Sequence, residues 1–224
     1  MTTPAALLAL GYGVYLLYAF ATGALYFYIH PVYIVPTAAT GAVLVVLAVL
    51  AGGRGERLTR SAAAMLAVPL AVGFLLPPQP LSPAAAGQRG VQPLTLGRGD
   101  ATPAFAPSAA PESYTIKDWI KAFAADPEPV RHAGKPVRVT GFVHHDATLP
   151  EGWFLVARFV VQCCAVDAQP VGLPVRGPAA APEPGRWVTV EGTWIVADTS
   201  GGRRAVIAAS AVAPTARPDQ PYLY

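Results

Sequence analysis

Residues 5–29 read AALLALGYGVYLLYAFATGALYFYI, and this uncharged stretch decides the fold of the N-terminal part of the chain. An α-helix rises about 1.5 Å per residue, so about 20 apolar residues cross the roughly 30 Å of hydrocarbon in a bilayer. A second stretch of this kind, YIVPTAATGAVLVVLAVLAG, follows at 33–52 after the break at His30-Pro31. We therefore predict two membrane-spanning helices joined by a short turn.

A third apolar segment, SAAAMLAVPLAVGFLLP at 61–77, is shorter and contains Pro69. We predict a third span here, which completes an α-helical membrane domain over residues 1–77. The alternative is a re-entrant or interfacial segment, because the stretch is short for a bilayer crossing.

The loop before this third segment carries Arg54, Arg57 and Arg60. Short loops rich in Arg stay in the cytoplasm. We therefore expect a multi-pass protein of the cell (inner or plasma) membrane. Its N-terminus is expected in the cytoplasm, and the chain after residue 77 is expected on the extracytoplasmic side.

The composition supports a membrane protein and argues against nucleic acid as a partner. The 224 residues are 53% hydrophobic and only 13% charged, with a mean hydropathy of +0.41 and a net charge of +3, whereas soluble domains carry about a quarter charged residues. Residues 1–53 contain no Asp, Glu, Lys or Arg. A nucleic-acid-binding surface needs clustered Lys and Arg, so we expect the lipid bilayer and not nucleic acid as a partner.

Tyr12, Tyr15 and Tyr18 lie on one face of the first predicted span. A hydroxyl group without a hydrogen-bond partner is costly inside a membrane. This face is therefore expected to contact other helices, which belong either to the same chain or to a second membrane protein. The three tyrosines are our candidate partner-binding residues.

Residues 78–113 are rich in Pro and Ala and show no hydrophobic period, which predicts a largely extended linker. A short helix is expected next, because Thr115 and Asp118 form a capping pattern and apolar residues then recur at helical spacing up to Asp126. From there the hydrophobic period is two. The predicted strands are 137–143, 153–164, 186–197 and 203–212.

Short strands with Gly141 and Gly192 inside them are typical of a small, strongly curved sheet. The predicted fold class is therefore an N-terminal α-helical membrane domain with three spans and a C-terminal mainly-β domain over residues 114–224. For the second domain we expect an OB-like barrel with one preceding short helix. A small β-sandwich is the alternative.

Cys163 and Cys164 are adjacent and are the only cysteines in the chain. Neighbouring residues on a regular strand point to opposite faces of the sheet. Three interpretations remain open. The pair is one buried and one surface residue without a function, a soft-metal site completed by His or Asp, or a redox-active pair.

The metal interpretation depends on the register of a predicted hairpin. If residue 143 opposes residue 153, His132 lies towards Cys163, and Asp167 is within reach of the same point. Thiolate, imidazole and carboxylate ligands suit Zn²⁺, which usually takes four. The candidate metal ligands are therefore Cys163, Cys164, Asp167 and His132, and zinc is the candidate cofactor.

Other polar groups carry less information. His144-His145-Asp146 is expected in a solvated loop, and Arg158 is expected to be a paired or snorkelling arginine. The sequence contains no recognisable nucleophile triad, phosphate loop or pair of catalytic carboxylates. We assign no catalytic residues and do not expect an enzyme.

Several segments together resemble a known family. They are YFYIHP (26–31), KPVRVTGFV (135–143), ARFVVQCCAVDAQPVGLPV (157–175) and WVTVEGTW (187–194). They are similar to the YcgQ-like family of bacterial membrane proteins, an uncharacterised family described as permease subunits. The resemblance implies a separate multi-span permease as partner and a link to zinc homeostasis. Cys163, Cys164 and Asp167 match the family's pattern.

Together these features predict an accessory membrane subunit of a permease, with a role in transport. Its exported β-domain is expected to bind a ligand or a metal such as zinc. The alternatives are a membrane-anchored thiol-redox protein and a structural protein of the cell envelope that binds another protein.

Overall fold

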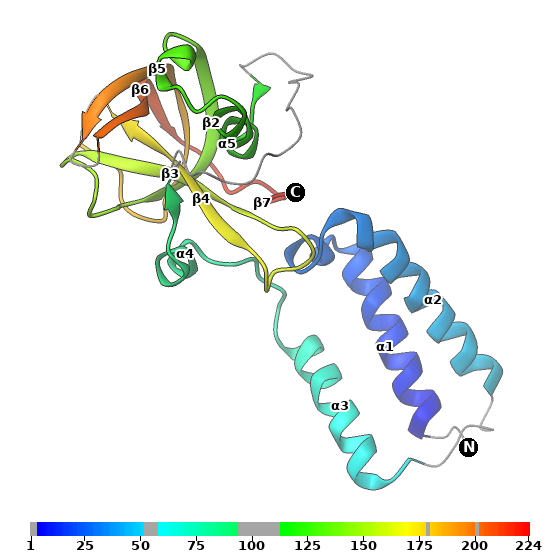
Figure 1. The fold of residues 1–224 in the computed structure, drawn as a ribbon. Coiled ribbons are helices and arrows are strands. Elements are labelled where there is room, and N and C mark those ends of the chain that lie inside the picture. The colour runs from blue at the N-terminus through cyan, green and yellow to red at the C-terminus, as the bar shows by residue number, and fades with distance from the viewer. Residues whose placement is uncertain (1–3, 52–57, 94–112, 178–179, 200–201) are drawn as a thin grey trace. The chain divides into compact units, whose positions relative to one another are not determined.

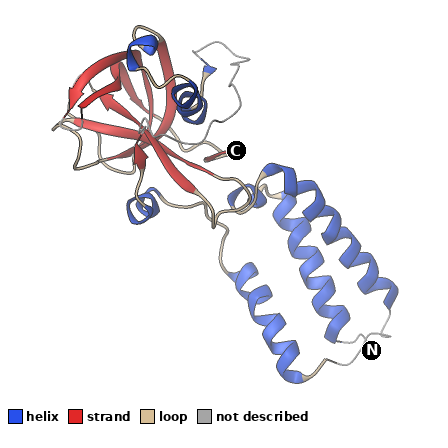
Figure 2. Ribbon diagram, in the orientation of Figure 1, coloured by secondary structure: helices blue, strands red, loops and turns tan. Residues whose placement is uncertain are grey.

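The computed structural model describes residues 4–51, 58–93, 113–177, 180–199 and 202–224. Helices form the N-terminal part of the chain, and the C-terminal part is mainly β (Figures 1 and 2). Two compact units are present. The helical unit contains the chain up to Pro80, the segment Gln162–Val166 and Tyr224. The β unit contains Leu81–Val161 and Asp167–Leu223.

The described part of the helical unit contains three helices and two short 3₁₀ turns. They are α1 (Pro4–Ala21), η1 (Ala24–Phe27), η2 (Pro31–Tyr33), α2 (Ile34–Ala51) and α3 (Arg60–Leu75). Among the described residues, two helical segments are long and apolar enough to cross a membrane, one of 18 residues (Pro4–Ala21) and one of 21 (Pro31–Ala51). The helix α3 is shorter, with 16 residues. Of the arginines that we used to orient the chain, Arg54 and Arg57 lie outside the described residues.

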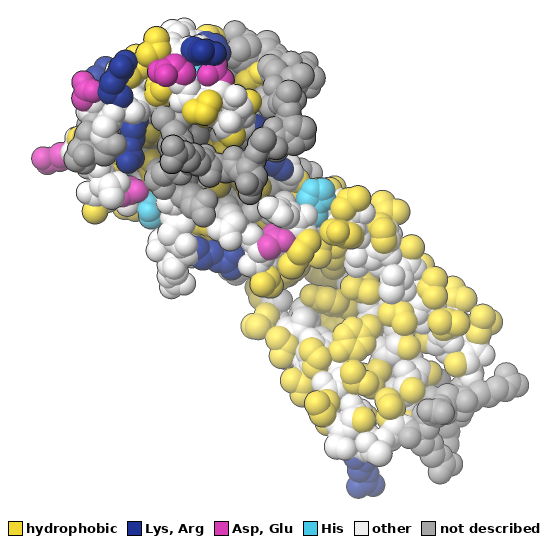
Figure 3. Space-filling model, in the orientation of Figure 1, with side chains coloured by type: hydrophobic (Ala, Val, Ile, Leu, Met, Phe, Trp, Pro, Cys, Tyr) yellow, Lys and Arg dark blue, Asp and Glu magenta, His cyan; other side chains and the backbone are white. Residues whose placement is uncertain are grey.

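Helices α1 and α2 approach closely at two glycines. A Cβ atom on Gly13 would lie 2.7 Å from the carbonyl oxygen of Gly41, which is nearer than a real Cβ atom can come. Small residues allow helix backbones to pack against each other in this way. The outward surfaces of the helices remain apolar, and hydrophobic side chains cover them in Figure 3.

The β unit contains seven strands among the described residues. They are β1 (Gln92–Pro93), β2 (Pro136–His144), β3 (Trp153–Val160), β4 (Gln169–Arg176), β5 (Trp187–Thr199), β6 (Gly202–Pro214) and β7 (Tyr222–Leu223). Strand β2 pairs with β3, β3 with β4, β4 with β6, β6 with β5, and β5 with β2 again. These five strand pairings therefore form a closed cycle that begins and ends at β2. The two-residue strands β1 and β7 add to β4 and β3 in parallel.

Helical elements accompany the strands in this unit. They are α4 (Pro83–Arg89), α5 (Ile116–Ala125) and the 3₁₀ turn η4 (Pro129–His132). The predicted helix start is confirmed, because Thr115 and Asp118 form a complete capping box before α5. The apolar face of α5 is buried, and the Trp119 ring packs edge-on against Trp194 of β5 with centroids 5.3 Å apart. This contact ties the helix to the core of the β unit.

Three elements of the described residues lie where we expected none. Strand β4 lies between the predicted strands 153–164 and 186–197 and contains Pro170 and Pro174, which lack the N–H group that a central strand needs. Both prolines precede the two β4 residues that pair with β6, namely Val175 and Arg176, so the missing donors do not interrupt that ladder. In addition, α4 and β1 lie inside the predicted linker, while residues 94–112 of it are outside the described residues.

Candidate metal centre

The two cysteines lie in a loop and not in a strand. Strand β3 ends at Val160, and the chain bends at Gln162 before it reaches Cys163. We call residues Gln162–Asp167 the thiol loop. Because the strand has ended, alternation between sheet faces no longer applies, and the Sγ atoms of Cys163 and Cys164 lie 3.5 Å apart. Neither cysteine forms a disulfide; Cys163 is exposed and Cys164 is partly buried.

Asp167 completes a group of donor atoms in the same loop. The two Sγ atoms and a carboxylate oxygen of Asp167 all lie within 4.8 Å of one another. Among the residues that the structure describes, this is the group of His, Cys, Asp and Glu side chains whose spacing suits a metal ion. Three of the four predicted ligands are therefore brought together.

The spacing of the two sulfur atoms fits a tetrahedral zinc ion. Zn–S bonds are about 2.3 Å long, which places two thiolates of one tetrahedron about 3.8 Å apart. The observed separation of 3.5 Å is close to that value. Two thiols and one carboxylate suit zinc and other thiophilic ions better than Mg²⁺ or Ca²⁺, which prefer oxygen ligands.

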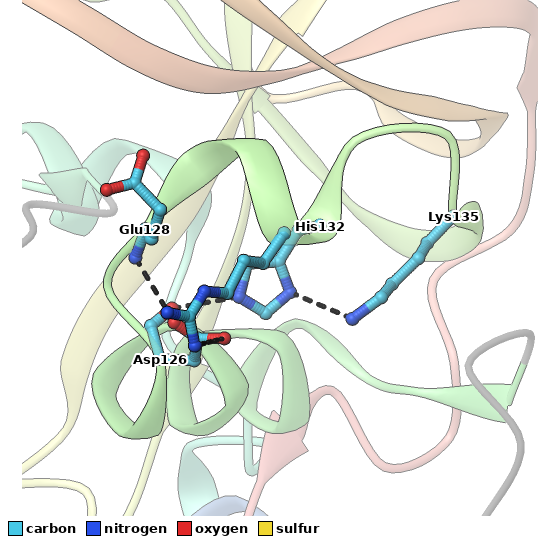
Figure 4. Close-up of polar contacts among 5 residues, drawn as sticks. Asp126, Glu128, His132 and Lys135 are labelled. Atoms are coloured by element: carbon cyan, nitrogen blue, oxygen red, sulfur yellow. Dashed lines mark hydrogen bonds and ion pairs between the residues drawn. The ribbon is translucent and has the colours of Figure 1, made fainter.

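The fourth predicted ligand, His132, lies elsewhere and has a structural environment (Figure 4). Its side chain is 3% exposed, and its ring packs on Phe123 with centroids 4.1 Å apart. Nε2 lies 2.9 Å from the carbonyl oxygen of Asp126 and donates to it, while Nδ1 lies 3.4 Å from Nζ of Lys135 and accepts from it. Both ring nitrogens are therefore engaged, and His132 is outside the group of donor atoms.

The prediction of His132 as a ligand depends on the register of the β2–β3 hairpin, and the observed register differs from the predicted one. Val143 pairs with Val156, so the expected opposition of residues 143 and 153 is wrong by three positions. Trp153 pairs instead with Arg176 of β4. The hairpin loop is consequently longer than assumed, and the prediction that placed His132 beside Cys163 loses its basis.

Arg158 fixes the C-terminal segment beside β3. Its Nε donates to the carbonyl oxygen of Pro221 over 3.1 Å, and its Nη2 donates to that of Gln220. The guanidinium also lies over the ring of Trp187, 5.7 Å from the centroid. The expectation of a paired arginine is confirmed. The contribution of Gln220 and Pro221, whose carbonyl oxygens bind Arg158, could not be predicted from the sequence, because these residues belong to no recognisable motif.

The tyrosine face of α1 is divided between two environments. The hydroxyl of Tyr12 donates to the carbonyl oxygen of Leu66 in α3 over 2.7 Å. The ring of Tyr15 packs edge-on against Phe74 of the same helix, with centroids 5.2 Å apart. Tyr18 remains 51% exposed. Two of the three candidate partner-binding residues therefore contact a helix of their own chain.

A second candidate site is a cavity of about 400 Å³ in the β unit. Its lining residues are Ser82, Pro83, Ala84, Gly87, Val143, His144, Pro184 and Gly185. Burial lowers the pKa of His144 below its usual value of 6.5; the Asp146 carboxylate opposes this shift and His145 adds to it. His145 itself is exposed, and its Nε2 lies 2.9 Å from the carbonyl oxygen of Pro182. The mostly apolar lining gives this cavity no set of metal ligands.

The comparison with protein families gives a match in the C-terminal part of the chain. Residues 115–224 are similar to the family described as the DUF1980 C-terminal domain. The match covers the thiol loop and supports an uncharacterised family for this part of the chain. No curated protein and no solved structure matches the chain.

Proposed function

We propose that this protein is a membrane-anchored accessory subunit of a permease, and that its β-domain presents the thiol loop as a binding site for a soft metal ion such as Zn²⁺. The observation that carries the metal assignment is the group formed by Cys163, Cys164 and Asp167, whose donor atoms lie within 4.8 Å of one another. A site of two thiolates and one carboxylate leaves a fourth position for water or for a ligand from a partner. Such a site suits capture and transfer of a metal ion.

The apolar surface of the helices supports insertion into a bilayer. In α2, Val49 and Leu50 are 68% and 69% exposed, and Leu75 of α3 is 79% exposed. In the core helix of a water-soluble domain such side chains would be buried, because exposing them to water is unfavourable. In a bilayer these side chains contact lipid chains, so that their apolar surface is not exposed to water.

The proposed topology has three spans and places the β-domain outside the cytoplasm. The 16 residues of α3 cover about 24 Å, so this helix needs a slightly thinned bilayer or flanking apolar residues such as Leu76. Arg60 stands at the start of α3, and it belongs to the basic loop that favours the cytoplasmic side. An odd number of spans then carries the chain across the membrane.

We propose an OB-like barrel for the β-domain. The pairings of β2, β3, β4, β6 and β5 form a closed cycle, and β4 and β6 run parallel. Closure of a small sheet removes its exposed edges. In this arrangement the thiol loop is the connection between the second and third strands of the cycle.

The permease partner is proposed from the resemblance to the YcgQ-like family together with the exposure of Tyr18. This side chain is 51% exposed on α1, whereas Tyr12 has its hydrogen bond within the chain. A tyrosine at that position offers a hydroxyl donor and an aromatic ring to a neighbouring helix.

Zinc binding by the full-length chain in detergent micelles tests the metal assignment. We expect one Zn²⁺ per chain in an equilibrium competition titration, and we expect the double substitution C163S/C164S to abolish it, because the metal loses both soft ligands. D167N is expected to weaken binding, because it removes a charged ligand. D219N is the matched control, since Asp219 is an exposed carboxylate outside the thiol loop. Zinc retention by the double variant would refute the assignment.

Co-purification from native membranes tests the permease partnership separately. A mild-detergent pull-down of the tagged chain is expected to recover a multi-span membrane protein in a fixed ratio. Tyr18→Ala is expected to reduce that ratio, while Tyr12→Phe leaves it unchanged. Recovery of the chain alone from its native membrane would contradict the partnership.

A second function is favoured by the close approach of the two sulfur atoms. Cys163 and Cys164, 3.5 Å apart, can form a disulfide between neighbouring residues when the disulfide of a partner oxidoreductase accepts their two electrons and two protons. The partner's disulfide is thereby reduced to two thiols. This function predicts that thiol labelling of the chain isolated from its native membrane is lost and returns after treatment with a reductant.

A further inference from the structure

The thiol loop is paired with the turn between α1 and α2. Ile29 and Cys164 form an antiparallel β-bridge. The amide of His30 donates to the carbonyl oxygen of Cys163 over 2.9 Å, and the amide of Ala165 donates to that of Tyr28 over 2.8 Å. Residues Gln162–Val166 consequently group with the helices in one compact unit.

The last residue of the chain reinforces this pairing. The hydroxyl of Tyr224 donates to the carbonyl oxygen of Tyr26 over 2.8 Å. The ring of Tyr224 also meets the imidazole of His30 edge-on, with centroids 5.2 Å apart. The turn is therefore held from two sides by segments that are far from it in the sequence.

The same two residues provide both the thiols and the backbone contacts. Cys163 contributes its Sγ to the group of donor atoms and its carbonyl oxygen to His30. Cys164 contributes its Sγ to the same group and is the bridge partner of Ile29. Any ligand that fixes the two side chains also restricts the backbone that pairs with the turn.

We propose that metal binding to the thiol loop strengthens the pairing of this loop with the α1–α2 turn, so that occupancy of the site is transmitted to the end of the helical hairpin. This inference rests on the proposed zinc site. The coupling is reciprocal, because two events that stabilise the same arrangement must favour each other to the same degree. Loosening the pairing therefore weakens metal binding, although no ligand is altered.

The imidazole of His30 is not needed as a metal ligand in this scheme. Its Nδ1 accepts from the amide of Val32 over 3.2 Å, which helps to start η2. A metal bound through Nε2 requires a proton on Nδ1, and this proton would displace that hydrogen bond. The contribution of His30 comes instead from its backbone amide and its ring contact.

Two measurements on the full chain in detergent micelles test the coupling, with Zn²⁺ as the probe. Hydrogen exchange of the His30 and Ala165 amides is expected to slow at least several-fold when Zn²⁺ saturates the chain, while peptides from β6 are unchanged. Tyr224→Phe removes the hydrogen bond from Tyr224 to the carbonyl oxygen of Tyr26 and is expected to weaken Zn²⁺ binding about two- to tenfold. Tyr33→Phe is the matched control, because the Tyr33 ring also faces His30, with centroids 6.4 Å apart.

The outcomes separate this inference from the site on which it rests. The coupling is supported if the wild-type chain binds Zn²⁺, if hydrogen exchange of the His30 amide slows on binding, and if the Tyr224→Phe variant binds Zn²⁺ more weakly. The coupling is overturned, and the site left intact, if the chain binds Zn²⁺ while exchange of the His30 amide is unchanged and the Tyr224→Phe variant keeps the wild-type Zn²⁺ affinity. A wild-type chain that binds no Zn²⁺ overturns both.

Discussion

The Sγ atoms of Cys163 and Cys164 lie 3.5 Å apart, and the carboxylate of Asp167 reaches the same point from three residues further along the chain. All three donors belong to one short loop. A site built this way depends little on the packing of the β-domain, and its preference for a metal is set mainly by its two sulfur atoms.

The first prediction concerns that preference. Cd²⁺ is expected to compete with Zn²⁺ for the full chain, because two thiolates favour soft ions. Mg²⁺ and Ca²⁺ in about a thousandfold excess are expected to leave zinc in place, since they prefer oxygen ligands. A competition titration followed by the ultraviolet absorption of the Cd–thiolate bond measures both. Displacement of zinc by Ca²⁺ would contradict a thiolate site.

The second prediction separates a structural histidine from a ligand. His132→Gln breaks the hydrogen bond to Asp126 inside the domain and is expected to lower the free energy of unfolding by about 1–3 kcal/mol. Zinc binding is expected to be unchanged. All four tryptophans lie in the β-domain, so their fluorescence reports its unfolding in the full chain. His145→Gln, at an exposed site, is the control and is expected to stay within about 0.5 kcal/mol of wild type.

The third prediction tests the bulge in β5. The pairing of β5 with β6 shifts register between Glu191 and Gly192, and a Cβ atom on Gly192 would collide with the carbonyl oxygen of Ala208. Gly192→Ala is therefore expected to destabilise the β-domain by about 1–3 kcal/mol. In contrast, a Cβ atom on Gly87 of α4 meets nothing nearer than 4.0 Å. Gly87→Ala is the matched control and is expected to be neutral or stabilising by up to about 1 kcal/mol.

The fourth prediction is a dependence of stability on pH. Burial lowers the pKa of His144 in the folded chain, so the unfolded chain takes up the proton first as the pH falls below about 6.5. The contribution of His144 to stability is therefore present above this pH and lost below it. Denaturant unfolding followed by tryptophan fluorescence between pH 7.5 and about 5 measures the loss. His144→Gln is expected to flatten the profile, and an unchanged slope would contradict this role.

Much of the fold is predictable from the hydrophobic pattern. The apolar stretches of the N-terminal part and the period of two after Asp126 reflect burial, which the sequence encodes directly. The capping box at Thr115 is equally local. Strand β4 was not predicted because its prolines, Pro170 and Pro174, are unusual in a strand, and its pairing with β3 and with the distant strand β6 makes a strand there favourable.

The candidate site was predictable only in part, for a related reason. Cys163, Cys164 and Asp167 are near one another in the sequence, so their proximity in space needs no knowledge of the fold. The selection of His132 required the register of a hairpin, and an error of three positions was enough to choose a buried structural residue. The contacts of Tyr224 with Tyr26 and His30 join the C-terminal residue to the α1–α2 turn, far away in the sequence, which no local pattern reveals.

The central claim is that Cys163 and Cys164 bind a metal ion together. X-ray absorption at the zinc edge of the zinc-loaded full chain tests this most directly, because it counts the atoms bonded to the metal. The account predicts two sulfur atoms at about 2.3 Å, with the remaining positions filled by oxygen or nitrogen. A spectrum explained by oxygen and nitrogen alone would contradict it.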